Sequence, residues 1–260
     1  MRTQIPNAAM GAATVVVLAA LALAQGVAAE SIETRVFTSA APRGVLREIA
    51  PVFERMTGHR LVIESAFSTD LERRIESGDP FDVAILPPDM ADDLMRRNKL
   101  VAGSRVDLGR TGMGVAVRAG APKPDIGTVD GFRLALLAAP TVAYADGGAS
   151  GIQFHGILAR LGIAEAMKPK LRPYPSGGAV EALARGEADL VVIGISPILS
   201  APAVTLLGWL PPELQSYIVF TGSIGAAAKQ PADAQTLLNL LTSPAAIALF
   251  KSQGFEPVPH

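Results

Sequence analysis

Apolar and polar positions along this chain alternate between two periods. Short apolar runs typical of strands, such as TRVFTSA at residues 34–40, are followed by segments in which apolar residues recur at helical spacing. In the first such segment the apolar positions are Val45, Ile49, Val52, Phe53 and Met56. Pro51 lies inside this segment, where we expect a kink or a break, and Gly58 is a stop signal. The alternation of strands and helices continues along the chain and predicts an α/β fold with largely parallel sheets.

Two distant segments repeat the same order of elements. FSTDLERRIESGDPFDVAIL at residues 67–86 and PSGGAVEALARGEADLVVIG at residues 175–194 each read as a serine loop, a short helix, a glycine stop, an acidic residue and an apolar strand. In front of each lies another unit of strand, small-residue turn and helix. The chain is therefore expected to build one arrangement twice, as two similar lobes.

Four turns of small residues precede the predicted helices, at residues 38–43, 66–69, 147–151 and 176–178. In open α/β sheets, ligands bind beyond the carboxyl ends of the strands, where the helix N-termini point. The turn at residues 147–151 matches neither the P-loop nor the dinucleotide motif, and it carries no lysine, so an anion there would meet only backbone N–H groups and a helix N-terminus. The four turns predict one anion-binding cleft, unless they are ordinary strand-to-helix turns.

The N-terminus predicts the compartment. One positive charge at Arg2 precedes AATVVVLAALALA, an uncharged and mostly apolar run of 13 residues, and the small residues VAA follow at residues 27–29. This pattern is typical of a secretory signal peptide and is too short to span a bilayer. We expect residues 1–29 to be removed and the mature chain to begin at Glu30.

Composition narrows the classes of partner. The chain has no cysteine, so it has neither disulfides nor the lipid-anchoring cysteine of bacterial lipoproteins. Its net charge of −1 provides no basic field for nucleic acid or a membrane surface. The three histidines, at positions 59, 155 and 260, are too scattered for a metal site. We expect a periplasmic protein without a membrane anchor, metal or cofactor.

Several stretches together resemble one family. They are VFTSAAPRGVLREIAPVFERMTG, SAFSTDLERRIESGDPFDVAILPPD, GGASGIQFHGILARLG, GEADLVVIGIS and SPAAIALFKSQGFEP, which extend over nearly the whole mature chain. The sequence resembles the type II periplasmic binding proteins, most specifically the molybdate-binding proteins of ABC transporters. The resemblance implies two similar lobes with central, mostly parallel sheets, joined by two crossing strands near residues 109–114 and 219–225. It places lobe I at residues 30–110 plus 223–260 and lobe II at residues 111–222.

The resemblance also implies a binding site. In the family, backbone N–H groups and hydroxyls at helix N-termini hold a dianionic tetrahedral oxyanion. The matching ligand-binding positions are Ser39, Ala41, Ser68, Thr69, Ser150, Gly151, Ser176 and Gly177. Ser68 matches a ligand-binding serine, Ser150 a backbone donor, and Ser176 or Gly177 another backbone donor.

Two positions depart from the family pattern. Ala41 stands where the family has a serine, and Ile193 stands where it has a tyrosine. Each lost hydroxyl removes a hydrogen bond to a charged ligand, worth roughly 1.5–3 kcal/mol. The departures weaken the prediction of molybdate more than the prediction of an anion.

The function expected from the resemblance is that of a periplasmic substrate-binding component of an ABC importer. It is expected to be a monomer without catalytic residues that binds a molybdate- or tungstate-like oxyanion between its lobes and delivers it to an inner-membrane permease. One alternative is a binder of a small organic carboxylate, with Arg43 as the carboxylate contact. Another is an isomerase of such a carboxylate with His155 or a carboxylate as base, although the expected role of Asp82 and Asp189 is to bond turn backbone.

Overall fold

The computed structural model describes residues 32–258, so the expected signal peptide and the expected start at Glu30 lie outside the described residues. The strands are β1 (Glu33–Thr38), β2 (Arg60–Ser65), β3 (Val83–Leu86), β4 (Val106–Arg118), β5 (Val142–Ala145), β6 (Leu171–Tyr174), β7 (Leu190–Gly194), β8 (Val204–Trp209), β9 (Tyr217–Ile224) and β10 (Phe255–Glu256). The helices are α2 (Arg43–Thr57), α3 (Ser68–Ser77), α4 (Pro88–Arg96), α5 (Val129–Ala138), α6 (Ala149–Arg160), α7 (Ala164–Met167), α8 (Gly178–Arg185), α9 (Ile195–Leu199), α10 (Pro231–Leu241) and α11 (Pro244–Ser252). Strands and helices alternate for most of this length, as the apolar pattern predicts.

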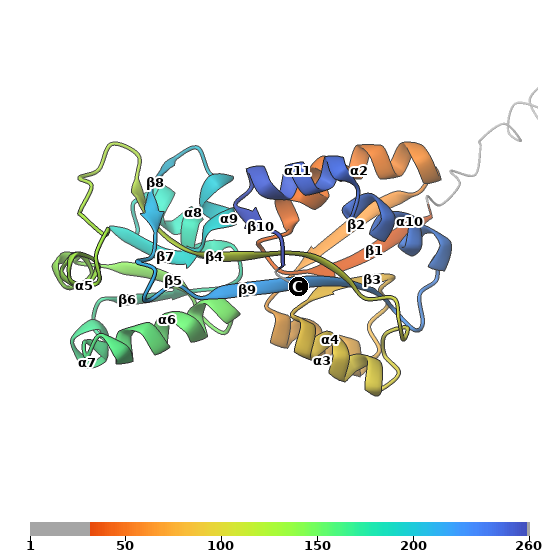
Figure 1. The fold of residues 1–260 in the computed structure, drawn as a ribbon, viewed down its shortest axis with the longest axis horizontal. Helices are drawn as coiled ribbons and strands as arrows, with labels where there is room; N and C mark the ends of the chain where they lie inside the picture. The colour runs from red at the N-terminus through yellow and green to blue at the C-terminus, as the bar shows by residue number, and fades with distance from the viewer. Residues whose placement is uncertain (1–31, 259–260) are drawn as a thin grey trace, which may run out of the picture. The chain divides into compact units, whose positions relative to one another are not determined.

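The strands form two similar lobes. Neighbouring strands follow the order β2-β1-β3-β9-β4-β7-β5-β6, with β8 and β10 paired to β4. In the first lobe β1 lies between β2 and β3 and runs parallel to both, and in the second lobe β5 lies between β6 and β7 in the same way. The long strands β4 and β9 pair antiparallel and connect the two groups (Figure 1). The predicted α/β class, the repeated unit and the two crossing strands are confirmed. The sheet is mixed rather than largely parallel, because every pairing made by β4 or β9 is antiparallel and the parallel pairings are those of β1 and β5. The residue boundaries of the lobes stay a prediction.

Helix α2 shows how the apolar pattern positions a helix. Val45, Leu46, Ile49 and Phe53 are buried against the first lobe's sheet, and the helix ends at Gly58 with φ of 75°. The helix continues without interruption through Pro51, so of the two expectations the break is wrong and the kink stays a prediction. Pro51 is exposed, and solvent can therefore bond the carbonyl that its missing N–H leaves unpaired.

The repeated segments end their helices alike. Gly78 after α3 and Gly186 after α8 both adopt left-handed conformations, with φ of 89° and 78°. Shortly after each glycine, an aspartate bonds the backbone beside the next strand. Asp82 accepts hydrogen bonds from Arg35 N at 2.8 Å and Gln230 N at 3.0 Å, and Asp189 accepts one from Thr141 N at 3.0 Å. The predicted local role of both aspartates is thereby observed.

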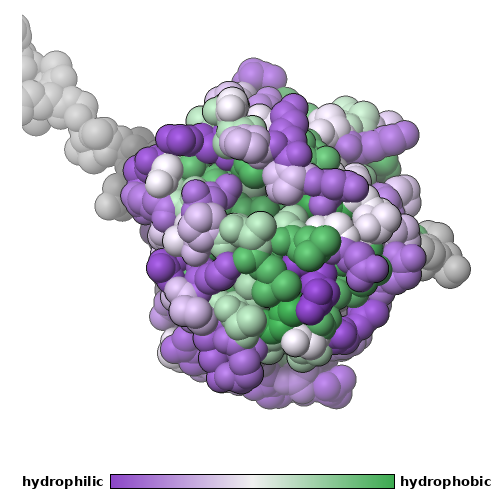
Figure 2. Space-filling view, turned by 90° about the vertical axis from the view of Figure 1, so that its left-hand side faces the viewer, coloured by the Kyte–Doolittle hydropathy of each residue, from purple (hydrophilic) through white to green (hydrophobic). Residues whose placement is uncertain are grey.

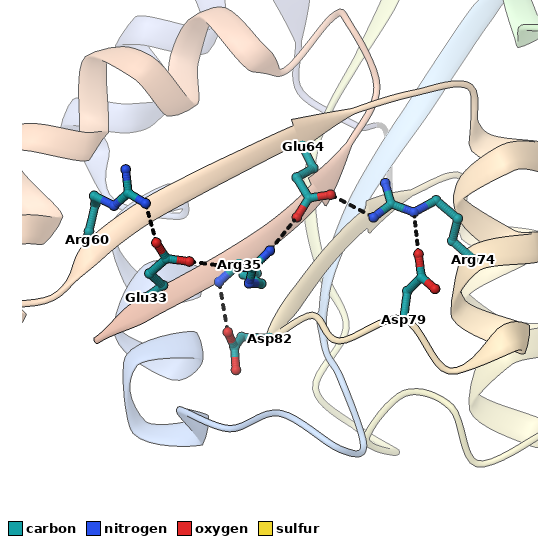
Figure 3. A network of polar contacts seen from close by, with 7 residues as sticks. All are labelled: Glu33, Arg35, Arg60, Glu64, Arg74, Asp79 and Asp82. Carbon is teal, nitrogen blue, oxygen red and sulfur yellow. Dashed lines mark hydrogen bonds and ion pairs between the residues drawn. The ribbon is translucent and has the colours of Figure 1, made fainter. Parts of the chain in front are cut away.

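An ion-pair network lies on β1, β2 and α3 of the first lobe. Figure 3 shows its members, which are Glu33, Arg35, Arg60, Glu64, Arg74 and Asp79, together with the backbone-bonding Asp82. Arg35 bridges Glu33 at 2.8 Å and Glu64 at 3.1 Å, and Arg74 bonds Glu64 at 2.6 Å and Asp79 at 2.7 Å. The bridging arginines thus cross-link strands β1 and β2 to helix α3.

Arg60 gives this network a pH dependence. Its hydrogen bond to Glu33 lowers the pKa of that carboxyl. A lowered pKa in the folded state means that Glu33 stabilises the fold above its unfolded-state pKa and loses this contribution as the pH falls. Because the Arg60 side chain is 59% exposed and that of Glu33 is 25% exposed, solvent screens the effect.

No helix among residues 32–258 is both long and apolar enough to cross a membrane. Figure 2 shows the end of the second lobe, at α5 and α7, where apolar surface at the centre is surrounded by polar residues. Leu134 of α5 is 61% exposed. Exposed apolar surface is common on folded proteins, so this surface does not indicate a binding site.

The two equivalent aspartates yield a stability prediction. Asp82 is 3% exposed, so Asp82→Ala leaves two backbone N–H groups with little access to water, and we expect the free energy of unfolding to fall by about 2–4 kcal/mol. Asp189 is exposed, so water replaces the carboxylate in Asp189→Ala and the loss should stay below about 1 kcal/mol. Urea unfolding measures both variants. Equal losses would contradict the assigned difference in burial.

Candidate functional site

A cleft lies between the lobes beyond the carboxyl ends of their parallel strands. Its volume is about 60 Å³, whereas one water needs roughly 10–15 Å³, so the cleft has room for several waters or a small ligand. Both lobes and both crossing strands contribute to its wall. The lining residues are Ser39, Ala40, Ala41, Phe67, Ser68, Thr111, Ala145, Gly148, Ala149, Ser150, Ser176, Gly177, Ile193, Gly194, Pro197, Ile218 and Phe220.

Five helices begin at or directly beside this cleft without a side-chain cap. They are α2, α3, α6, α8 and α9, whose N-cap residues are Pro42, Phe67, Gly148, Gly177 and Gly194. Among the helices that begin away from the cleft, Thr128 caps α5 and Ser243 caps α11, whereas α4, α7 and α10 also lack a side-chain cap. The first N–H groups of a helix have no partner within the helix, and they carry its positive end. The wall of the cleft therefore presents backbone donors suited to an anion.

Four serines add hydroxyl donors to the same wall. Ser39, Ser68, Ser150 and Ser176 all line the cleft. Within residues 32–258 the side chains of these four make no hydrogen bond to protein, whereas the buried Ser196 hydroxyl donates to Ala41 O at 2.9 Å. The four hydroxyls are therefore available to a ligand.

The structure brings most of the predicted site residues together. Besides the four serines, Ala41 and Gly177 line the cleft. Thr69 and Gly151 are outside the lining. Thr69 is exposed on α3, and Gly151 is buried where a Cβ would lie 2.0 Å from Ala145 O. Gly151 thus allows α6 to pack closely on the end of β5, which explains the glycine without a ligand.

Part of the cleft wall is apolar. Ile193, one of the two positions that depart from the family pattern, faces the cleft together with Phe67, Pro197, Ile218 and Phe220. The last four were not identified from the sequence, although Phe67 belongs to a predicted turn and Phe220 to a predicted crossing segment. A ligand here contacts carbon on one side and hydrogen-bond donors on the other.

Arg43 supplies a fixed positive charge beside the cleft. It is the first residue of α2 and is partly buried. Its guanidinium reaches the second lobe, since a Cβ on Gly177 would lie 3.4 Å from Arg43 Nη2. Among the described residues it makes no hydrogen bond or ion pair with protein, in contrast to the arginines of Figure 3. The guanidinium is therefore available for an anion.

The candidate bases lie elsewhere. His155 is exposed on α6 with its ring 5.1 Å from that of Tyr144, and burial raises the pKa of the Tyr144 phenol. Asp82 and Asp189 bond backbone away from the lining. Across residues 32–258, no aspartate, glutamate or histidine lines the cleft, and no cluster of such residues could hold a metal ion. The observed arrangement is suited to holding an anion.

Three known proteins share this chain's sequence or fold over most of its length. Aconitate isomerase from a Pseudomonas species is 33% identical over 266 residues, covering 100% of this chain and 99% of that protein. The molybdate-binding protein ModA of Azotobacter vinelandii is 31% identical over 239 residues, covering 88% of this chain and 91% of that protein. The solved structure of the Azotobacter vinelandii periplasmic molybdate-binding protein superposes with a TM-score of 0.70 at 25% identity, covering 87% of this chain and 100% of the other.

The match to a family model spans most of the described structure. Residues 34–256 match the model described as bacterial extracellular solute-binding protein. This range includes both lobes, the crossing strands and every residue that lines the cleft. The chain belongs to the family of bacterial extracellular solute-binding proteins, and within it resembles the molybdate-binding members.

Proposed function

We propose that this protein binds a small organic polycarboxylate in the cleft between its lobes. The observation that carries the proposal is the available guanidinium of Arg43 beside a wall that is partly apolar. A planar carboxylate accepts two parallel hydrogen bonds from a guanidinium, a geometry that lysine cannot provide. Other carboxylate groups of the ligand would accept from the serine hydroxyls and the helix N-termini.

The apolar wall favours an organic anion over molybdate. A tetrahedral oxyanion has oxygen on every side and gains nothing from contact with Ile193 or Phe220. An organic acid has a carbon skeleton whose burial is favourable, at about 25 cal/mol per Å². The replacement of two family hydroxyls by Ala41 and Ile193 acts in the same direction, since it removes donors and adds carbon surface.

The similar proteins support this ligand class. The relative that is 33% identical across the whole chain is named for aconitate, which is a tricarboxylate. Two relatives named for molybdate are 31% and 26% identical to this chain. They support an anionic ligand but do not favour an organic one. We take trans-aconitate as the first ligand to test.

The biological role that we propose is capture in the periplasm. After export and removal of residues 1–29, the mature protein would collect its ligand in the periplasm. It would then deliver the ligand to the permease of an ABC transporter in the inner membrane. The expected oxyanion importer has the same role with a different ligand.

The second candidate function is isomerisation of aconitate, favoured by the same relative. An allylic isomerisation removes a proton from the CH₂ carbon and returns one to the far carbon of the double bond, so a base must sit within reach of both. The described cleft lining offers hydroxyls but no carboxylate or imidazole. Binding is therefore the function that the geometry supports better.

Proton NMR in deuterium oxide distinguishes the two candidates. For a binder, trans-aconitate incubated with the purified protein should show no conversion to the cis isomer and no deuterium uptake above the protein-free sample. Catalytic conversion or exchange that increases with protein concentration would establish the isomerase instead.

Arg43→Gln tests the ligand class. Loss of a desolvated bidentate pair typically costs 2–5 kcal/mol, so the Kd for trans-aconitate should rise about 30-fold or more. Arg47→Gln is the matched control. Arg47 is exposed on the same helix, and its substitution removes the same charge as Arg43→Gln. Calorimetric titration should find the control within about twofold of the parent, given screening by salt. Equal effects of the two substitutions would contradict a direct contact with Arg43.

Ser150→Pro tests the backbone donors at the start of α6. Proline removes the N–H of the second residue of the helix, a position within the first turn where proline is tolerated, so the fold should persist. Affinity for trans-aconitate should drop at least about tenfold, or ~1.4 kcal/mol. Ser150→Ala removes only the hydroxyl and should cost less, about 0.5–1.5 kcal/mol for one hydrogen bond. Unchanged affinity in Ser150→Pro would mean that this turn has no part in binding.

A further inference from the structure

Phe67 belongs to the first lobe but contacts the second. It precedes α3 and serves as that helix's N-cap residue. Its ring lies against the turn before α6, where a Cβ would be 3.3 Å from the ring at Gly147 and 2.8 Å from it at Gly148. The ring also packs against the buried cluster of the second lobe that includes Ala145, and it lines the cleft.

The two glycines of this turn have different explanations. Gly147 has φ of 82°, a conformation that favours glycine whatever its neighbours are. Gly148 has φ of −95° and ψ of 166°, which any residue adopts. Real Cβ atoms essentially never approach other atoms within 3.0 Å, so the Phe67 ring in this position excludes a side chain at Gly148. The glycine at position 148 is therefore explained by the close approach of the Phe67 ring, because the backbone conformation does not require glycine.

A second contact between the lobes also joins a side chain of the first lobe to a glycine of the second. Arg43 of the first lobe reaches Gly177 of the second, which also lacks a side chain. Phe67 and Arg43 thus approach two different turns of the second lobe, and each of these turns precedes a helix whose N-terminus adjoins the cleft. Phe67 adds apolar surface to the cleft, and the guanidinium of Arg43 adds a positive charge beside it.

We propose that Phe67 holds the first lobe against the Gly147–Gly148 turn of the second lobe and that this contact is needed for tight ligand binding in the cleft. With the ring seated on the turn, the cleft keeps its volume of about 60 Å³, and the face of the ring becomes part of the apolar wall. A ligand that keeps the Phe67 ring off the Gly147–Gly148 turn binds without this contact between the lobes. The inference rests on the proposed function only for the choice of trans-aconitate as the probe.

Gly148→Ala is the direct test. The added methyl group collides with the ring while the backbone stays unstrained, and overpacking of this size should weaken trans-aconitate binding about tenfold. Gly156→Ala is the matched control, because Gly156 lies on the same helix and a Cβ there meets nothing within 4 Å. The control should bind trans-aconitate within twofold of the parent.

A double-substitution cycle assigns the effect to the ring. Phe67→Ala removes the collision partner, so adding Gly148→Ala to it should change the Kd less than twofold. Thermal unfolding without ligand should show all variants folded. If Gly148→Ala binds trans-aconitate like the parent, or weakens binding equally in the presence and absence of Phe67, the inference is wrong.

A measurement without ligand separates this inference from the proposed function. Because the chain has no cysteine, Ser77→Cys on α3 and Ala159→Cys on α6 allow one spin label on each lobe at exposed positions. Pulsed dipolar spectroscopy should show a longer mean distance between the labels in Gly148→Ala than in the parent or in Gly156→Ala. An unchanged distance in Gly148→Ala overturns the inference, whereas failure of the parent to bind any carboxylate overturns the proposed function alone.

Discussion

Backbone N–H groups at the start of a helix have no partner within the helix, and this constraint organises the cleft. Five helices begin at or beside the cleft, and none has a side-chain cap. The N-cap residues of four of them, Phe67, Gly148, Gly177 and Gly194, line the same small cleft, so unpaired N–H groups and partial positive charges lie close together there. An anion would satisfy these donors collectively, and the described lining of the cleft contains no lysine. The two lobes, the repeated units and the crossing strands serve to bring these helix ends together.

The repeated unit explains why the helix ends converge. In each lobe the first strand lies between its two neighbours and runs parallel to them, so the turns that follow the strands emerge at one edge. The crossing strands β4 and β9 set the two edges opposite each other (Figure 1). Arg43 and Phe67 then reach from one edge to glycines on the other. Charge and apolar surface are thereby added to a site otherwise built from backbone and serines.

The sequence predicted the fold well because its signals are local. Apolar periodicity locates the helices, and the glycines at 78 and 186 end two of them as expected. Four of the predicted serines line the cleft because small residues after a strand occupy the carboxyl edge of the sheet. Thr69 and Gly151 lie outside the cleft lining because register within a helix decides whether a residue faces the cleft or a neighbouring element. The apolar wall was missed because Ile218 and Phe220 look like ordinary strand residues until the sheet order places them beside the turns.

We propose that an organic carboxylate binds at the helix N-termini and contacts Arg43. A crystal structure of the parent protein grown with trans-aconitate tests it most directly. We expect carboxylate oxygens within hydrogen-bond distance of N–H groups at the starts of α3 and α6, a second carboxylate paired with Arg43, and carbon atoms against Ile193. A tetrahedral ion in the cleft with the Arg43 guanidinium turned to solvent, or trans-aconitate bound away from the cleft, would contradict it.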